Sequence, residues 1–188
     1  RDAWSVAHSM GGGTTILASL ARPDAFERQW VYEPIIFERD VARPEGAFDF
    51  VEATRRRRPV FESRQHVIAS YGSRPPLDEL DPACLAAYVQ HGFVDQADGT
   101  VRLACNPILE SRAFEQYLMD GWDHLPEVAI PVRVAYGTGG DDRPASAAAG
   151  IAARLPCGEL DSFEGSGHFG CFGPLDRAAA SIREWFVD

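Results

Sequence analysis

A serine, a histidine and two acids in this sequence could together transfer an acyl group. Ser9 is flanked by small residues, His168 lies in a glycine-rich stretch, and Glu33 and Asp141 lie between them. In this chemistry the imidazole takes the proton of the serine hydroxyl as the oxygen attacks a carbonyl carbon. A carboxylate orients the imidazole and stabilises its charged form. The order serine, acid, histidine therefore predicts a Ser-His-acid triad, provided that the fold brings the three side chains together.

The residues around Ser9 predict the element that would present its hydroxyl. Trp4 to Val6 can form a short buried strand, and Thr14 to Ala21 is typical of a helix. Between them, Ala7-His8-Ser9-Met10-Gly11 has the pattern of a nucleophile elbow in which alanine replaces the first glycine. Such a turn exposes the hydroxyl and points the backbone N–H of Met10 at a developing oxyanion. The competing interpretation is a glycine-rich loop at a helix N-terminus that binds a phosphate.

Glu33 follows the next predicted strand of the chain. Trp30 to Tyr32 is a short apolar run, and Pro34 stops it. Parallel sheets bind ligands at the carboxyl ends of their strands, so Glu33 is a candidate for the triad acid. The alternative interpretation is a solvated acid in a loop.

An alternation of strands and helices resumes near residue 130. We predict a buried strand from Ile130 to Gly137, and a loop of glycine and aspartate that contains Asp141 follows it. His168 lies in the loop after the last predicted strand. The pattern indicates an α/β fold with a mostly parallel sheet. The remaining predicted elements are a helix from Pro144 to Leu155, a strand from Glu159 to Phe163 and a helix from about Leu175 to Phe186.

The middle of the chain has a different pattern, polar and interrupted by prolines. We predict helices over 46–57, 63–71, 82–90 and 107–119, with one short extended piece over 100–105. The predicted organisation is a core of residues 1–37 and 127–188 with an all-helical insertion over 38–126. Arg55 to Arg58 form a run of four like charges, which either solvates a helix end or offers one arginine to an anionic substrate.

Composition excludes several classes of function. The 188 residues carry a net charge of −10, which argues against nucleic acid and anionic membrane surfaces as partners. The four cysteines form no C-x-x-C pair, so we expect no zinc site, no cofactor and reduced thiols in a cytoplasmic protein. The expected partner is a small-molecule substrate, and a homodimer is left open.

Several segments together resemble the α/β-hydrolase family. Residues 7–12 are similar to its nucleophile elbow, and Gly165-Ser166-Gly167-His168-Phe169 resembles its histidine loop. Residues 130–142 resemble its penultimate strand and acid turn, and the insertion lies where the family carries a cap domain. The resemblance implies an α/β-hydrolase core with a helical cap, Ser9 as nucleophile and His168 as base. It also implies hydrolysis of a small ester-like acyl compound through an acyl-enzyme.

Two departures from the family pattern concern the acid and the oxyanion site. The family's G-x-x-D is not met after Gly137, because the aspartates come one and two places late. Asp141 or Asp142 could serve from a remodelled loop, but we favour Glu33, which is similarly placed to the acid of the haloalkane dehalogenase branch. The family's upstream oxyanion loop and N-terminal strands have no counterpart in this sequence. We therefore expect the 188-residue chain alone to be poorly active or unstable.

Three functions are compatible with these observations. The first is a serine hydrolase, with Phe61, Tyr71, Tyr88, Phe93 and Trp122 lining an apolar pocket in the cap. The second is a ligand-binding protein on the same fold that has lost catalysis. The third is an inactive truncated fragment. Covalent reaction of Ser9 with a fluorophosphonate would distinguish the first function from the other two.

Overall fold

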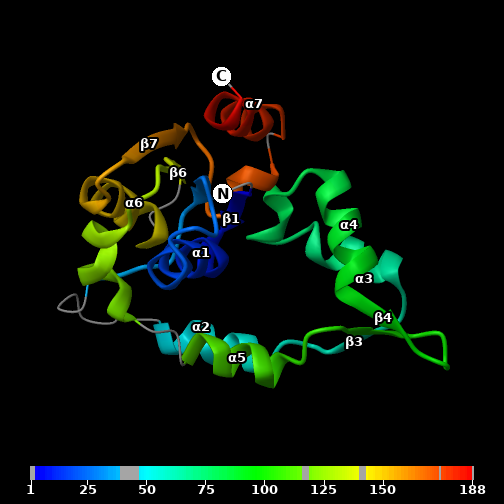
Figure 1. Ribbon diagram of the computed structural model, residues 1–188. Helices are drawn as coiled ribbons and strands as arrows, with labels where there is room; N and C mark the ends of the chain where they lie inside the picture. Colours follow the sequence, from blue (N-terminus) through cyan, green and yellow to red (C-terminus); the bar gives the residue numbers. More distant parts are fainter. Residues whose placement is uncertain (1–2, 39–46, 116–118, 140–142, 174, 188) are drawn as a thin grey trace. The chain divides into compact units, whose positions relative to one another are not determined.

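The structure is a computed structural model that describes residues 3–38, 47–115, 119–139, 143–173 and 175–187. The chain divides into two compact units, Arg1–Val41 with Met119–Asp188, and Ala42–Leu118 (Figure 1). We expected the insertion to cover 38–126, whereas the second unit ends at residue 118. Asp141 and Asp142 lie outside the described residues.

The first unit is built on a sheet of four parallel strands. These are β1 (Trp4–His8), β2 (Arg28–Tyr32), β6 (Val132–Gly137) and β7 (Gly158–Phe163), in the order β1-β2-β6-β7. Most residues of the central strands β2 and β6 are buried because both of their faces are covered. The predicted α/β core with a mostly parallel sheet is confirmed.

Helices cover both faces of this sheet (Figure 1). On one face, Val31 and Val134 pack with Ile16 of α1 (Ser9–Ala21) and Ile151 of α6 (Arg143–Arg154). On the other face, Trp30 and Tyr32 pack against α7 (Leu175–Phe186) and its Trp185. Successive residues of β2 therefore serve opposite cores, as the period of two in a strand requires. Among the described residues of this unit there are also two 3₁₀ helices, η2 (Met119–Glu127) and η3 (Gly170–Phe172).

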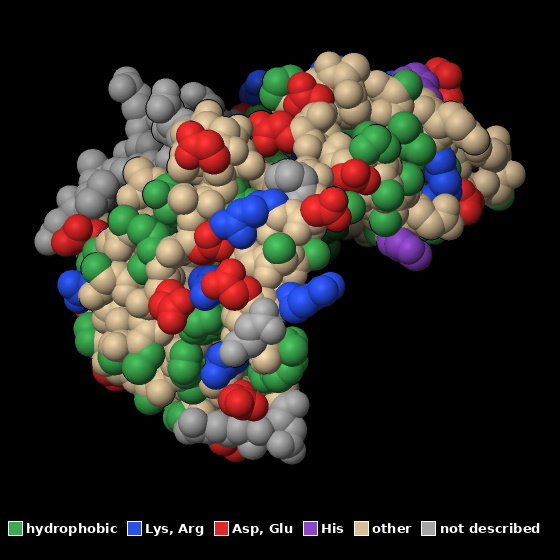
Figure 2. Space-filling view, turned by 90° about the horizontal axis from the view of Figure 1, so that it is seen from above, with side chains coloured by type: hydrophobic (Ala, Val, Ile, Leu, Met, Phe, Trp, Pro, Cys, Tyr) green, Lys and Arg blue, Asp and Glu red, His purple; other side chains and the backbone are tan. Residues whose placement is uncertain are grey.

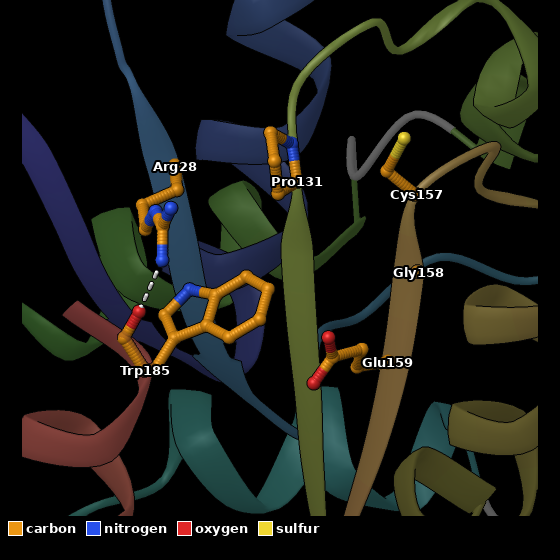
Figure 3. Close-up of a pocket in the computed structure, with 6 residues that line it drawn as sticks. All are labelled: Arg28, Pro131, Cys157, Gly158, Glu159 and Trp185. Carbon is orange, nitrogen blue, oxygen red and sulfur yellow. Dashed lines mark hydrogen bonds between the residues drawn. The ribbon is translucent and has the colours of Figure 1, made fainter. Parts of the chain in front are cut away.

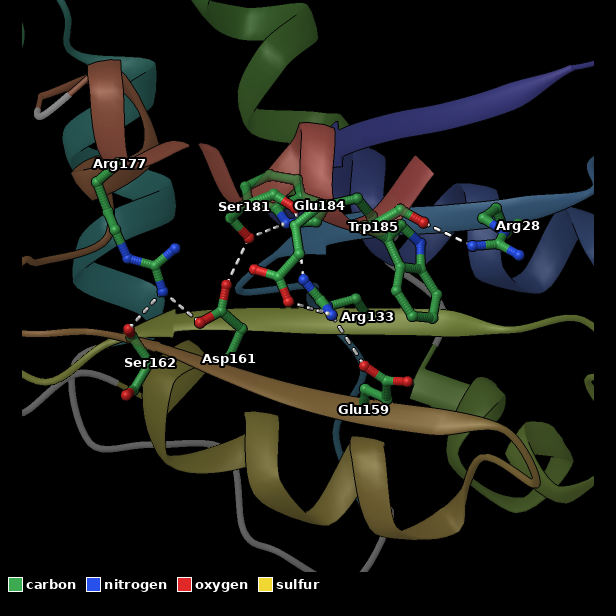
Figure 4. Close-up of polar contacts among 10 residues, drawn as sticks. Arg28, Arg133, Glu159, Asp161, Ser162, Arg177, Ser181, Glu184 and Trp185 are labelled. Carbon is green, nitrogen blue, oxygen red and sulfur yellow. Dashed lines mark hydrogen bonds and ion pairs between the residues drawn. The ribbon is translucent and has the colours of Figure 1, made fainter. Parts of the chain in front are cut away.

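Polar contacts attach α7 to the sheet (Figure 4). The indole N–H of Trp30 donates to the Ser181 hydroxyl at 2.8 Å, and that hydroxyl donates to Asp161 on β7. Arg177 donates to the same carboxylate. Because Trp30 and Ser181 are buried, their hydrogen bond compensates for the water that folding removes.

The second unit contains a small antiparallel sheet as well as helices. Its strands are β3 (Val60–Phe61), β4 (Phe93–Asp95) and β5 (Val101–Leu103), in the order β3-β5-β4. The expectation of an all-helical insertion is therefore wrong. The strands form because Asp98-Gly99 makes a hairpin turn, with Gly99 at φ 84°. The helices are α2 (Ala47–Arg55), α3 (Arg64–Tyr71), η1 (Leu77–Glu79), α4 (Pro82–Gly92) and α5 (Pro107–Glu115).

The aromatic residues of the insertion form the core of the second unit. Phe61 and Phe93 are buried with Val67, and Tyr71 and Tyr88 pack against them. They therefore pack among themselves in this unit, where we expected them to line a substrate pocket. Trp122 packs in the first unit against the cluster that contains Ile151.

The four consecutive arginines all have partners within the chain. Arg55 and Arg56 pair with Glu52, and Arg57 donates to Glu110 at 2.7 Å and to the Tyr88 hydroxyl at 3.1 Å. The Arg58 guanidinium lies 4.7 Å from the ring centre of Phe61. These contacts give the run a structural role in the second unit.

Candidate active site

Ser9 lies at an abrupt change from strand to helix. His8 is the last residue of β1 and Ser9 is the first of α1, with no loop between them. The serine has φ 57°, a left-handed conformation that costs a residue with a side chain roughly 1–2 kcal/mol. Gly12 lets α1 pack closely against Pro34, because an added Cβ at this position would lie only 3.1 Å from the Cβ of Pro34. The elbow predicted from the sequence is thus present as a backbone shape.

His168 lies in the loop that follows β7 and leads to η3. The loop turns at Gly165, which has φ 68° and donates its N–H to the Thr138 hydroxyl at 2.9 Å. The Gly139 N–H donates to the carbonyl of Ser166 at 2.9 Å. The loop therefore lies directly on the end of β6, and His168 Nε2 comes to 2.9 Å from the Ser9 hydroxyl oxygen.

Glu33 lies immediately after β2 and is fully buried. One carboxylate oxygen lies 2.6 Å from His168 Nδ1, and the other accepts the Gly137 backbone N–H at 2.8 Å. Its φ of 43° turns the side chain at the strand end. The alternative interpretation of Glu33 as a solvated loop acid is therefore wrong. The structure brings Ser9, His168 and Glu33 into one hydrogen-bonded line.

Met10 lies in the first turn of α1, next to Ser9. The first N–H groups of a helix have no acceptor within the helix, and they sit at the positive end of its dipole. The Met10 N–H is therefore suited to bind negative charge that develops beside the serine. Met10 is also the residue whose N–H the sequence predicts as the oxyanion donor.

Two further side chains contact the histidine loop. His8 Nε2 lies 2.8 Å from the carbonyl oxygen of His168, and the Tyr32 hydroxyl donates to the carbonyl of Gly167 at 2.9 Å. Burial and the neighbouring His168 ring lower the pKa of His8 from 6.5 to about 4. No sequence motif indicates either contact, although His8 and Tyr32 precede Ser9 and Glu33 in the chain.

A shallow hollow of about 400 Å³ lies at the other end of the sheet (Figure 3). Arg28 begins β2 and Gly158 begins β7, whereas Ser9 and Glu33 follow the last residues of β1 and β2. The hollow thus lies at the amino ends of the strands and the three polar residues at the carboxyl ends. In the hollow, Arg28 donates to the carbonyl of Trp185 at 2.6 Å. It is not the place where a substrate would meet Ser9.

The described residues hold no group of three or more His, Cys, Asp or Glu side chains arranged to bind a metal ion. Among the described helices, none combines the length and apolar character that a bilayer crossing requires.

Comparison with solved structures identifies the fold. No family model matches the sequence, and no curated protein matches it at a significant level. Among matching structures, a peroxisomal α/β-hydrolase, Lpx1 of Saccharomyces cerevisiae, has a TM-score of 0.76 and 15% identity over 97% of this chain and 52% of its own. The E-2-(acetamidomethylene)succinate hydrolase has a TM-score of 0.77 and 17% identity over 98% of this chain and 66% of its own.

A third match is an esterase of Mycobacterium tuberculosis, with a TM-score of 0.67 and 18% identity over 98% of this chain and 62% of its own. The chain thus spans about half to two-thirds of the length of these proteins. A parallel sheet with helices on both faces agrees with these matches. The chain has the α/β-hydrolase fold.

Proposed function

We propose that this protein is a serine hydrolase of small ester-like acyl compounds. The observation that supports this most directly is the line of two hydrogen bonds from Ser9 through His168 to Glu33, at 2.9 and 2.6 Å. Two of the structural matches, an esterase and a hydrolase of a succinate derivative, support the same reaction class.

The geometry suits a reaction through an acyl-enzyme. The Ser9 oxygen would attack the substrate carbonyl carbon while His168 Nε2 takes the hydroxyl proton, and the Met10 N–H would stabilise the resulting oxyanion. His168 would return that proton to the departing alcohol as the ester bond breaks. A water molecule would then release the acid by the same two steps, with its proton passing through His168 to Ser9.

Glu33 would keep the histidine in the correct tautomer during these steps. Its two oxygens accept from Nδ1 of His168 and from the Gly137 N–H, so the carboxylate is held from both sides. A buried carboxylate beside Nδ1 favours the tautomer with the proton there, which leaves Nε2 free to act as base toward Ser9.

A fluorophosphonate probe tests this function without requiring full turnover. We expect the wild-type chain to become covalently labelled at Ser9, as located by peptide mass spectrometry, and Ser9→Ala to remain unlabelled. Ser73→Ala, a change of the same chemistry at an exposed position in the second unit, should label like the wild type. A folded wild-type chain that stays unlabelled would contradict the proposal and favour the ligand-binding alternative.

A further inference from the structure

The last residues of β1 and β2 form a pair at the end of the sheet. His8 and Tyr32 are aligned in the register of the two parallel strands. Each directly precedes a residue of the proposed triad, Ser9 in one case and Glu33 in the other. Their side chains therefore start from the two backbone positions that determine where the nucleophile and the acid lie.

Both side chains donate to consecutive carbonyls of the histidine loop. The Tyr32 hydroxyl lies 2.9 Å from the Gly167 oxygen, and His8 Nε2 lies 2.8 Å from the His168 oxygen. A carbonyl oxygen can only accept, so Nε2 of His8 must carry a proton in this contact. These bonds join segments that are 135 and 160 residues apart in the chain.

The surroundings of His8 favour its neutral form with the proton on Nε2. Burial and the His168 ring, whose centroid lies 4.6 Å away, lower the pKa of His8 to about 4. The rings of Phe169, Phe172 and Tyr32 surround it, and Glu33 is the acid that acts on it electrostatically. A neutral neighbour matters because a second positive charge would oppose formation of the His168 imidazolium.

We propose that His8 and Tyr32 are positioning residues that clamp the backbone of the histidine loop to the strand ends carrying Ser9 and Glu33. The inference rests on the proposed hydrolase function of this site. Because both donors lie on the sheet, the clamp makes the distance between His168 and Ser9 depend on the register of β1 and β2. The two hydrogen bonds of the triad then do not rely only on the conformation of the histidine loop. Small displacements of reacting groups have large effects on rate, which gives such a clamp its value.

Single substitutions at Tyr32 and His8 distinguish the effect of hydrogen-bond donation from that of ring packing. Tyr32→Phe keeps the ring and removes the hydroxyl. His8→Gln places an amide N–H near the position of Nε2, whereas the shorter His8→Asn cannot reach it. We expect Tyr32→Phe and His8→Asn each to slow labelling of Ser9 at saturating fluorophosphonate about tenfold, with the half-saturating probe concentration unchanged. His8→Gln should stay close to the wild-type rate.

Two results would overturn the clamp. One is labelling at the wild-type rate in both Tyr32→Phe and His8→Asn. The other is a His8→Gln variant as slow as His8→Asn, because ring packing would then be the only contribution. A purely structural role would lower the melting temperature of the variants without this rescue by glutamine.

Nitrogen NMR of the wild-type imidazoles gives a test that needs no variant to fold. Near neutral pH, His8 should show a protonated Nε2 and an unprotonated Nδ1. If Ser9 reacts with the fluorophosphonate but His8 has the opposite tautomer, the clamp is overturned and the proposed function is not. A folded but unlabelled wild-type chain would overturn the proposed function, and with it the catalytic purpose of the clamp.

Discussion

Glu33 has two donors and uses one oxygen for each of them, the His168 ring and the Gly137 N–H. Glutamine at this position would have the same shape but only one acceptor, so one donor would face an amide NH₂ group. We expect Glu33→Gln to slow acyl transfer to Ser9 by about four orders of magnitude, as amide replacement of a triad acid does. The measurement is hydrolysis of p-nitrophenyl acetate or the rate of fluorophosphonate labelling.

The matched control for this change is Asp141→Asn, which tests the other acid expected from the sequence. We expect it to leave the labelling rate within about threefold of the wild type. A larger loss in Asp141→Asn than in Glu33→Gln would show that Glu33 is not the acid.

The depressed pKa of His8 predicts a pH dependence of stability. In the unfolded chain this histidine takes up a proton near pH 6.5, whereas in the fold it does so near pH 4. The unfolded state therefore binds more protons between these values, and the free energy of unfolding falls as the pH drops through this window. The full loss is about 3 kcal/mol. Urea unfolding at a series of pH values gives the free energy of unfolding at each pH. Between pH 6.5 and about 4 this free energy should fall less steeply in His8→Gln than in the wild type. An equally steep fall in both proteins would show that His8 is not the group responsible.

Ser9 and His168 could be predicted from the sequence because short motifs surround them. The choice of acid could not, since spacing along the chain does not show which carboxylate reaches Nδ1. Burial of Glu33 against the Gly137 N–H supports that acid, and only coordinates reveal such a contact. The donors His8 and Tyr32 were missed for the same reason, because their acceptors are distant backbone carbonyls.

The loop that carries His168 packs tightly against Tyr32 on the sheet. An added Cβ at Gly170 would overlap both the Tyr32 hydroxyl and the Cβ of Ser166. We expect Gly170→Ala to lower the free energy of unfolding by about 1–3 kcal/mol, the usual cost of overpacking, and to slow labelling of Ser9. Chemical denaturation checks the first effect and the probe checks the second.

Gly11→Ala is the contrasting change, because an added Cβ in α1 would meet nothing within 4 Å. It should keep or raise the free energy of unfolding, since alanine favours a helix over glycine by roughly 1 kcal/mol. Equal effects of the two substitutions would mean that the fit of the loop against Tyr32 is unimportant.

Strands and helices of the core could be predicted because their patterns are long. The predicted helix over Leu175–Phe186 is confirmed by α7, and the predicted strand after residue 130 by β6. The small sheet of the second unit was missed because β3 has two residues and β4 three, too few to display an alternating pattern. There the pairing partners, rather than local preference, determine the strands.

Acidic and basic side chains are interspersed over the face shown in Figure 2, in a chain whose net charge is −10.

Among the described strands, β1 is at one end of the order β1-β2-β6-β7 and has a described neighbour on one side only. Two of its side chains are exposed, Trp4 at 51%, with its ring stacked on Phe186, and Val6 at 54%. Exposed apolar edge strands are templates for pairing between chains.

A lysine at this edge should therefore reduce self-association of the 188-residue chain. We expect Val6→Lys to raise the protein concentration at which light scattering detects aggregates, with a free energy of unfolding within about 1 kcal/mol of the wild type. Ile108→Lys is the matched control, because it adds the same charge at a side chain 50% exposed on helix α5. An equal gain in both variants would assign the effect to net charge rather than to the edge.

Ser9 and Glu33 are the two residues other than glycine that adopt a positive φ among those described. The backbone at the proposed nucleophile and acid is therefore strained, which lowers the free energy of unfolding. A variant without the nucleophile could regain this free energy. Ser9→Gly and Ser9→Ala both remove the hydroxyl, but only glycine relaxes the backbone. We expect Ser9→Gly to have the higher free energy of unfolding by about 1 kcal/mol. Selection for thermal stability alone, in a variant that has lost the nucleophile, would then favour glycine over alanine at this turn.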